Sequence, residues 1–388
     1  MYHLTFSIVL IGLWFLTGSA ERVAVVQVFR HGQRTPVNFY PNDPYKDSEV
    51  WNGKSLGELT NTGKSQHLDL GKFTRNLYSD FLSEKYNHTE FRIETTDVDR
   101  THMSAQVNVY GIFPASGDEV WHSSLNWQPI PIHPSDASIW SSTYYPLTCD
   151  IFLKLFTEVL NSDVYQNINK EYASTFEILS SNSGEKVTDI VGVMNIWDPL
   201  KSEDSLGLPL PEWTKDVYPE PFRTLTGYAF ASSTYTTQMK RIVMGPFLND
   251  LVEYFESMVK DPTSSPKLKL YSGHDTNVAA LLNTLGAFDP PYPPAFASSI
   301  YFELDREGAE YYVKVFSKDG DDFKQITIEG CHSNCSFSDF KSKLDDVIVD
   351  VATRDKECLE GAVSLGDSTN YNNQYVTDLI KRLRSLRT

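Results

Sequence analysis

Residues 25–36 read VVQVFRHGQRTP and are the most informative stretch of the chain. A run of apolar, mostly β-branched residues enters a tight corner at Gly32, as a buried parallel strand does where it ends at a sheet edge. The corner carries one imidazole, His31, between the guanidiniums of Arg30 and Arg34. The stretch therefore predicts a strand that ends at a functional site on the edge of an α/β sheet.

The two arginines are suited to an anionic ligand. A guanidinium is planar, always charged and forked, so two of them make a cradle for the oxygens of a phosphate or a carboxylate. An imidazole nitrogen attacks phosphorus and leaves as a neutral group, which gives a covalent intermediate without a metal. The alternative for an isolated Arg-His-Gly motif is a solvated basic cluster at the surface. The preceding strand and Pro36 favour a site, with His31 as its nucleophile.

This run resembles the R-H-G-x-R-x-P signature of the histidine acid phosphatases, and further matches follow in order between about residues 23 and 360. The resemblance implies a phosphoglycerate-mutase-like fold, in which a mixed sheet is flanked by helices. It also implies an acid phosphatase that hydrolyses phosphomonoesters, and a homodimer. Gln33 stands at the variable position of the signature, where several relatives carry Asp, and this departure affects the protons around His31.

Residues 91–105 read FRIETTDVDRTHMSA and predict a short strand followed by a helix that begins near Arg100. Asp97 or Asp99 is the expected cap of that helix, whose free backbone N–H groups attract an anion. The alternative is a surface ion pair between Arg100 and one of these carboxylates. The run is similar to the T-D-x-x-R-T-x-x-S-A segment of the family, which implies that Arg100 is a third phosphate-binding arginine. His102 is interpreted as structural.

Residues 268–277 read LKLYSGHDTN and predict a second strand that enters a glycine corner, followed by a helix over 278–286. Two such corners meet at one sheet edge even when they are distant in sequence. A capping Asp beside a structural His is the alternative for this pair alone. The family resemblance implies that His274 binds phosphate and that Asp275 is the proton donor.

The expected reaction has two displacements. The arginines and His274 hold the phosphoryl oxygens while His31 attacks in line. Asp275 protonates the leaving alkoxide and then assists the water that breaks the phosphohistidine. An Asp of ordinary pKa donates a proton best in acid, and neighbouring positive charges lower the pKa of His31, so that it stays a nucleophile there.

The acidic composition restricts the partners. A net charge of −17 over 388 residues disfavours nucleic acid and anionic membrane surfaces. The nine histidines contain no H-E-x-x-H or close metal cluster, so neither a metal nor another cofactor is expected. The substrate is then a small phosphomonoester or a phosphoprotein. Two rival functions are a phytase, for which a pocket richer in Lys and Arg is expected, and a secreted binding protein without catalysis.

The first twenty residues predict a secretory signal peptide. Residues 1–20 lack Asp, Glu, Lys and Arg, have an apolar middle, and end in small residues. A membrane anchor is the alternative, disfavoured by the short apolar run. Lysosomal relatives typically carry a C-terminal membrane anchor, whereas residues 381–388 form a basic tail. We therefore expect a secreted protein without an anchor, with the lysosomal lumen as the alternative.

Four cysteines in a secreted chain predict two disulfides, with three connectivities open, against the alternative of free buried thiols. Cys331 and Cys335 are close enough to close a small loop. The family resemblance implies this pair together with Cys149 and Cys358. Asn87 and Asn334 lie in sequons and are the expected glycosylation sites.

Alternating strand and helix patterns predict an α/β core over residues 21–114 and 263–388, with a mainly helical cap inserted at 115–262. Apolar periodicity predicts helices over 62–82, 233–259 and 337–351. Residues 299–304, 310–316 and 323–328 are expected to form an antiparallel addition to the sheet.

Overall fold

The computed structural model describes residues 20–140 and 148–364, so the basic tail and all but Ala20 of the expected signal peptide lie outside the described residues. Over this part of the chain the centre is a sheet with strand order β3-β2-β4-β1-β5-β6-β7, and β8 pairs with β6. The strands are β1 (Glu21–Arg30), β2 (Phe91–Thr95), β3 (His133–Pro134), β4 (Leu268–Gly273), β5 (Ser299–Glu307), β6 (Glu310–Asp319), β7 (Asp322–Ile326) and β8 (Cys335–Ser336).

The sheet has a parallel half and an antiparallel half. Strands β3, β2, β4 and β1 run parallel, whereas β5, β6 and β7 follow in antiparallel pairs. Arg30 at the end of β1 pairs with Gly273 at the end of β4, and Thr95 at the end of β2 pairs with Ser272. Three strands therefore deliver their carboxyl ends to one edge. The mixed sheet and its antiparallel addition confirm the predicted fold class.

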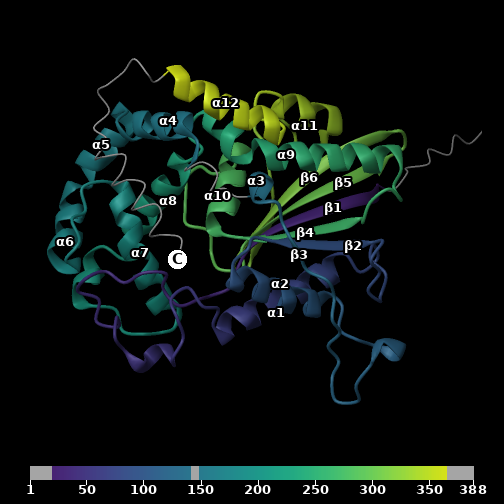
Figure 1. Ribbon diagram of the computed structural model, residues 1–388, viewed down its shortest axis with the longest axis horizontal. Coiled ribbons are helices and arrows are strands. Elements are labelled where there is room, and N and C mark those ends of the chain that lie inside the picture. The colour runs from purple at the N-terminus through teal and green to yellow at the C-terminus, as the bar shows by residue number, and fades with distance from the viewer. Residues whose placement is uncertain (1–19, 141–147, 365–388) are drawn as a thin grey trace, which may run out of the picture.

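Helices cover both faces of the sheet. In Figure 1, α1 (Asn61–Leu77) and α2 (Asp99–Ile112) lie below it, and α9 (Thr237–Lys260), α11 (Phe337–Leu344) and α12 (Val351–Ser364) lie above it. Phe29 and Ile93 are fully buried in a core between the sheet and helices α1 and α2, whereas Val26 and Val28 belong to the larger core on the other face. Alternate residues of β1 thus bury opposite faces, as the side-chain period of two requires.

A helical lobe lies beyond the carboxyl ends of the parallel strands (Figure 1). It contains α4 (Asp150–Leu160), α5 (Asp163–Glu171), α6 (Ala173–Ser183), α7 (Ile190–Ser205) and α8 (Phe222–Ser232). Two other elements of the 115–262 segment belong to the sheet, because β3 pairs with β2 and α9 packs on β1. The helix α10 (Asp275–Thr284) follows β4, and α3 (Ala137–Trp140) packs against α9.

Several expected boundaries differ from the structure. The helix predicted over 62–82 ends at Leu77, where the Tyr78 N–H still donates to the Thr74 carbonyl (3.1 Å) and turns follow. The helix predicted over 337–351 ends at Leu344, where the N–H groups of Val347 and Ile348 both donate to the Leu344 carbonyl (2.8 Å), and the next helix begins only at Val351. Both helices therefore end before the periodic pattern of apolar residues does.

The expected cap of α2 is wrong. Val98 occupies the N-cap position and makes no side-chain hydrogen bond, and Asp99 is the first residue inside the helix. The carboxylate of Asp99 still lies in the first turn, where the helix dipole favours it.

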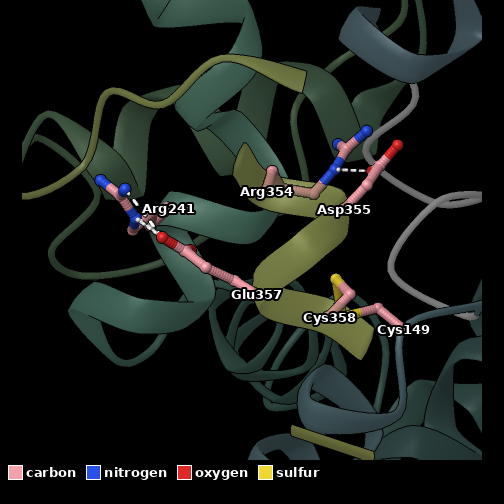
Figure 2. The surroundings of a disulfide bond; sticks show 6 residues. All are labelled: Cys149, Arg241, Arg354, Asp355, Glu357 and Cys358. Atoms are coloured by element: carbon pink, nitrogen blue, oxygen red, sulfur yellow. Dashed lines mark hydrogen bonds and ion pairs between the residues drawn. A yellow bond between two sulfur atoms is a disulfide. The ribbon is translucent and has the colours of Figure 1, made fainter. Parts of the chain in front are cut away.

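Two disulfides are formed, Cys149–Cys358 and Cys331–Cys335. The first joins the start of α4 to α12 across 209 residues of sequence (Figure 2). Beside it, Arg241 on α9 binds both carboxylate oxygens of Glu357, with Nε–Oε2 and Nη2–Oε1 distances of 3.0 and 2.9 Å. Helix α12 is therefore fastened both to the helical lobe and to the layer above the sheet.

Both sequons lie at accessible places. Asn334 is exposed within the small Cys331–Cys335 loop, and Asn87 is partly exposed. The Asn87 Oδ1 atom accepts hydrogen bonds from the backbone N–H of Thr89 (3.0 Å) and from its hydroxyl (2.8 Å).

A buried pair of carboxyl groups joins the lobe to the loop that follows the first corner. Asp43 is 7% exposed and Glu203, on α7, is 0% exposed. Within the described chain, Asp43 Oδ2 and both Glu203 oxygens lack a donor. The two side chains are in hydrogen-bonding contact, and two ionised carboxylates cannot bond each other, so the contact requires a proton. Burial, together with this contact, raises the pKa of Glu203.

Loss of the long-range disulfide is expected to destabilise the fold strongly. Replacing both Cys149 and Cys358 by Ser removes the constraint on a loop of 209 residues, and we expect the free energy of unfolding to fall by about 2–5 kcal/mol. The matched pair of substitutions at Cys331 and Cys335 opens a loop of only 4 residues and is expected to cost less, because the constraint grows with loop length. Urea unfolding of both variants checks this order, and equal losses would contradict it.

The Asp43–Glu203 pair is expected to make stability depend on pH. Because the folded pKa of Glu203 lies above its unfolded value, its contribution is complete below the ordinary carboxyl pKa and is lost as pH rises through the raised pKa. We expect Glu203→Gln, whose amide always donates, to flatten the decline in unfolding free energy that urea titrations measure between about pH 5 and pH 9.

Within this window, the substitution is expected to reduce the fall in unfolding free energy by up to about 1.4 kcal/mol for each pH unit. Glu212→Gln is the matched control, because the Glu212 side chain is 84% exposed and ion-paired at the surface. Parallel pH profiles for the wild type and Glu203→Gln would contradict the shared proton.

Candidate active site

The two predicted corners meet at the carboxyl edge of the parallel strands. The backbone N–H of His31 donates to the carbonyl of Gly273 (2.9 Å), which extends the β1–β4 ladder by one bond. The imidazole rings of His31 and His274 then lie 5.6 Å apart between centroids, nearly edge to face. Residues separated by more than 240 positions in the chain thus become neighbours because their strands are adjacent and parallel.

The first corner needs glycine. A Cβ atom on Gly32 would lie 2.3 Å from the carbonyl oxygen of Gly63 on α1, closer than two such atoms approach. The Gly32 N–H donates to the hydroxyl of Ser104 on α2 (3.1 Å). Both helices under the sheet therefore hold the backbone of this corner, and a side chain at Gly32 would push it off α1.

The neighbouring carbonyl selects the tautomer of His31. Its Nδ1 atom lies 2.8 Å from the carbonyl oxygen of Gly32, which only accepts hydrogen bonds, so in the neutral ring Nδ1 carries the proton. The lone pair is then on Nε2. His31 is buried, with 1% of its surface exposed, and Nε2 is the ring nitrogen able to act as a nucleophile.

Three buried guanidiniums surround His31. Arg30, Arg34 and Arg100 are 6%, 5% and 6% exposed, and in the described residues the Nε atom of each lacks a hydrogen-bond partner. Burial and then the charge of Arg34 lower the pKa of Arg100 to about 10. Like charges gathered away from water repel one another, so a bound anion would stabilise this arrangement.

Both histidines of the site are held neutral. Burial, and then the charges of Arg100, Arg30 and Arg34, keep the pKa of His31 well below its ordinary value. Burial and then Arg100 lower the pKa of His274 to about 3. His274 Nε2 lies 3.0 Å from the hydroxyl of Thr96. Each ring therefore remains uncharged in mildly acidic solution.

Asp275 begins α10 and is ionised in this site. Its Oδ2 atom lies 2.8 Å from Nη2 of Arg30, and Oδ1 accepts the backbone N–H of Thr276 (2.8 Å). Burial by itself raises the pKa of Asp275, but Arg30 and Arg34 outweigh burial and the net shift is downward. The Asp275 side chain is 22% exposed, so solvent reaches the carboxylate.

Asp198, which the sequence analysis missed, holds Arg34. This residue of α7 accepts Nη2 of Arg34 at 2.6 Å and Nη1 at 3.2 Å, and it also accepts the backbone N–H of Val37 (2.9 Å). No local pattern marks Asp198, because its partner lies 164 residues away. The helical lobe therefore contributes directly to the arginine cluster.

The variable signature position makes a second connection to the lobe. The Gln33 side chain donates through Nε2 to the hydroxyl of Ser205 (2.9 Å) and accepts from the hydroxyl of Thr60. His102, interpreted as structural, lies beside Asp97 with an Nε2–Oδ1 distance of 3.8 Å. Arg100 is not in a surface pair with Asp97 or Asp99, since it is buried among the other arginines.

The chain is similar to known proteins over most of its length. The family model of the histidine phosphatase superfamily (branch 2) matches residues 23–318. Prostatic acid phosphatase of Bos taurus is 32% identical over 84% of this chain and 84% of its own length. Lysosomal acid phosphatase of Xenopus laevis is 31% identical over 86% of this chain and 78% of its own length.

Solved structures show the same fold. Hafnia alvei phytase in complex with tartrate superposes with a TM-score of 0.66 at 15% identity, covering 86% of this chain and 98% of that one. The phytase of Citrobacter braakii gives 0.65 at 15% identity, covering 88% and 99%. The match of the family model over most of the chain and the similarity to the two phosphatases lead to one assignment: the chain is a member of the histidine phosphatase superfamily (branch 2).

Proposed function

We propose that this chain is a secreted acid phosphatase that hydrolyses phosphomonoesters through a phosphohistidine on His31. The observation that carries the proposal is a neutral imidazole, with its Nε2 lone pair unprotonated, among three buried guanidiniums. A nucleophile within a cluster of positive charge suits attack on a phosphoryl group. The similarity to proteins named acid phosphatases supports the same reaction.

The charges of the site match a phosphomonoester when Asp275 is protonated. Arg30, Arg34 and Arg100 carry three positive charges, and Asp198 and Asp275 carry two negative ones, which leaves a net charge of +1. Protonation of Asp275 raises this to +2, the complement of a phosphate dianion. The incoming phosphoryl oxygens compete with Asp275 for Arg30, and their negative charge raises the pKa of that carboxyl.

The reaction then follows in two displacements. Nε2 of His31 forms a bond to phosphorus as the bond from phosphorus to the ester oxygen breaks, and Asp275 gives its proton to that oxygen. In the second step water attacks phosphorus and the bond to Nε2 breaks, while the Asp275 carboxylate takes a proton from the water. The three arginines and His274 stabilise the charge on the other phosphoryl oxygens.

An acid optimum follows from the two titrating groups. Asp275 acts as a donor only while protonated, so the rate falls as pH rises and this carboxyl ionises. His31 stays neutral in acid because burial and the arginines hold its pKa well below the ordinary value. Because the pKa of His31 is low, this nucleophile stays neutral at a pH where Asp275 is able to donate a proton.

Secretion is supported by chemistry outside the site. Two disulfides persist in an oxidising compartment, and residues 1–20 have the composition of a signal peptide. Sequons at Asn87 and Asn334 fit the same route, with the lysosomal lumen as the alternative. None of the helices that the structure describes has the length and apolar character of a membrane span.

Activity measurements on two variants test the mechanism. We expect release of p-nitrophenol from p-nitrophenyl phosphate to be highest in acid and resistant to chelator, and His31→Ala to lower kcat at least about 1,000-fold because the nucleophile is lost. Asp275→Asn is expected to lower kcat about 100-fold for an alkyl phosphate, and less for p-nitrophenyl phosphate, whose leaving group needs less proton assistance.

The control is His102→Ala, which removes a histidine beside Asp97 and is expected to retain wild-type turnover. Equal losses in Asp275→Asn for both leaving groups would contradict proton donation. A folded wild type without turnover would favour the binding-protein alternative, and a strong preference for inositol hexakisphosphate would favour a phytase.

Anion binding is expected to draw a proton into the site. Sulfate keeps its charge in mild acid, so any proton taken up on binding is bound by the protein and not by the ligand. Because Arg30 and Arg34 hold the pKa of Asp275 low until an anion arrives, we expect net proton uptake at about pH 5. Calorimetric titration in two buffers of different ionisation enthalpy measures it. Asp275→Asn should bind sulfate without uptake, and an equal uptake in both proteins would contradict the role of Asp275.

A further inference from the structure

A proline-rich loop between α10 and β5 lies directly over the arginine and histidine of the first corner. The Pro294 carbonyl accepts Nη1 of Arg30 (2.5 Å), and the backbone N–H of Arg30 donates to the Ser298 carbonyl (2.9 Å). The backbone N–H of Ala297 donates to the carbonyl of His31 (3.1 Å). The loop is therefore bonded to the backbone and the side chain of the signature itself.

Phe296 occupies the centre of this contact. The Cζ atom of Arg30 lies 4.1 Å from the centroid of its ring, and the ring centroid lies 6.1 Å from that of His31. Arg30 is thus held by Asp275 and the Pro294 carbonyl through its N–H groups, and by Phe296 on its face. The ring is only partly buried, so it lies at the boundary between the site and solvent.

The loop backbone is constrained where it presents this ring. Ala297 has φ of +58°, a left-handed conformation that residues with a Cβ atom seldom adopt. The backbone N–H of Ala295 donates to Asp319 Oδ1 (2.8 Å), and Pro291 packs so closely on α8 that a Cβ on Gly227 would lie 2.2 Å from its carbonyl oxygen. The ring position is therefore set by contacts on both sides of it.

We propose that Phe296 is a positioning residue, which fixes the Arg30 guanidinium plane against the phosphoryl group and shields His31 from water. This inference rests on the proposed phosphatase function and adds a residue to its machinery. Stacking occupies the face of the guanidinium and none of its N–H groups, so Nε, which has no partner among the described residues, stays available to an oxygen atom of the ligand.

Shielding of His31 has a measurable consequence. Burial is the largest cause of the low pKa of His31, and the charged or titratable groups that face this ring are Arg100, Arg30, Arg34 and His274. Removing the Phe296 ring admits water while Arg100, Arg34 and His274 stay in place, so the pKa of His31 rises toward its ordinary value. The acid limb of the rate profile then moves to higher pH.

Three substitutions separate the two roles of the ring. Phe296→Tyr keeps the aromatic face, and we expect its Kd for inorganic phosphate, measured calorimetrically, within about twofold of wild type. Phe296→Leu keeps most of the bulk but loses the stacking, so its Kd should rise about fivefold with the acid limb of kcat/KM in place. Phe296→Ala loses both functions, and its acid limb should move to higher pH.

Phe288→Leu is the matched control on the same loop. Phe288 is 3% exposed and packs on Tyr292 (5.3 Å between ring centroids), so its substitution is expected to lower Tm without changing the phosphate Kd or the acid limb. Folded Phe296→Leu and Phe296→Ala variants with wild-type Kd and pH profile would overturn the inference. A wild type that binds phosphate without turnover would overturn the proposed function instead, and the Kd series would still decide the role of Phe296.

Discussion

The hydrogen bond from His31 to the carbonyl of Gly273 is the contact on which the site depends. It continues the parallel register of β1 and β4 by one residue, so the two corners leave the sheet side by side. The register of β2 against β4 brings the third segment to the same edge, where the Thr96 N–H donates to the Ser272 carbonyl (3.2 Å). A shift of one residue in either register would turn the neighbouring side chains to the opposite face.

The arginine cluster opposes folding and has to be offset by other contacts. Burying three guanidiniums together costs solvation and adds repulsion, which the lowered pKa of Arg100 reflects. Asp198 and Asp275 return part of this free energy through ion pairs, and Phe296 covers the face of Arg30. The fold thus keeps a site of net positive charge, partly desolvated, for an anion, and the helical lobe takes part because Asp198 lies on it.

Burial shifts titratable groups toward their neutral forms in two places. In the site it keeps His31 neutral, as the proposed mechanism requires of a nucleophile that works in acid beside Asp275. Behind the site it raises the pKa of Glu203, so the carboxyl pair that joins α7 to the first loop holds its proton. Desolvation shifts the imidazole and the carboxyl in opposite directions, and both shifts favour the neutral form.

The sequence by itself determined the strands that end at glycine corners, the antiparallel addition, and the residue types His31, Arg30, Arg34, Arg100, His274 and Asp275 that meet at the sheet edge. These features are local, since apolar period, β-branching and glycine turns act within a few residues. The resemblance of these segments to a family signature indicated that they belong to one site.

Only the tertiary structure decided what surrounds these residues. Asp198 binds Arg34 across 164 positions of sequence. Ala297, next to Phe296, has a left-handed backbone conformation that the sequence around it does not predict. Val98 occupies the N-cap position expected for an aspartate. Likewise, only the tertiary structure shows that β3 joins the sheet and that α9 packs on it. Such contacts depend on how separate elements pack, and packing is set by long-range burial and hydrogen bonding that no local pattern records.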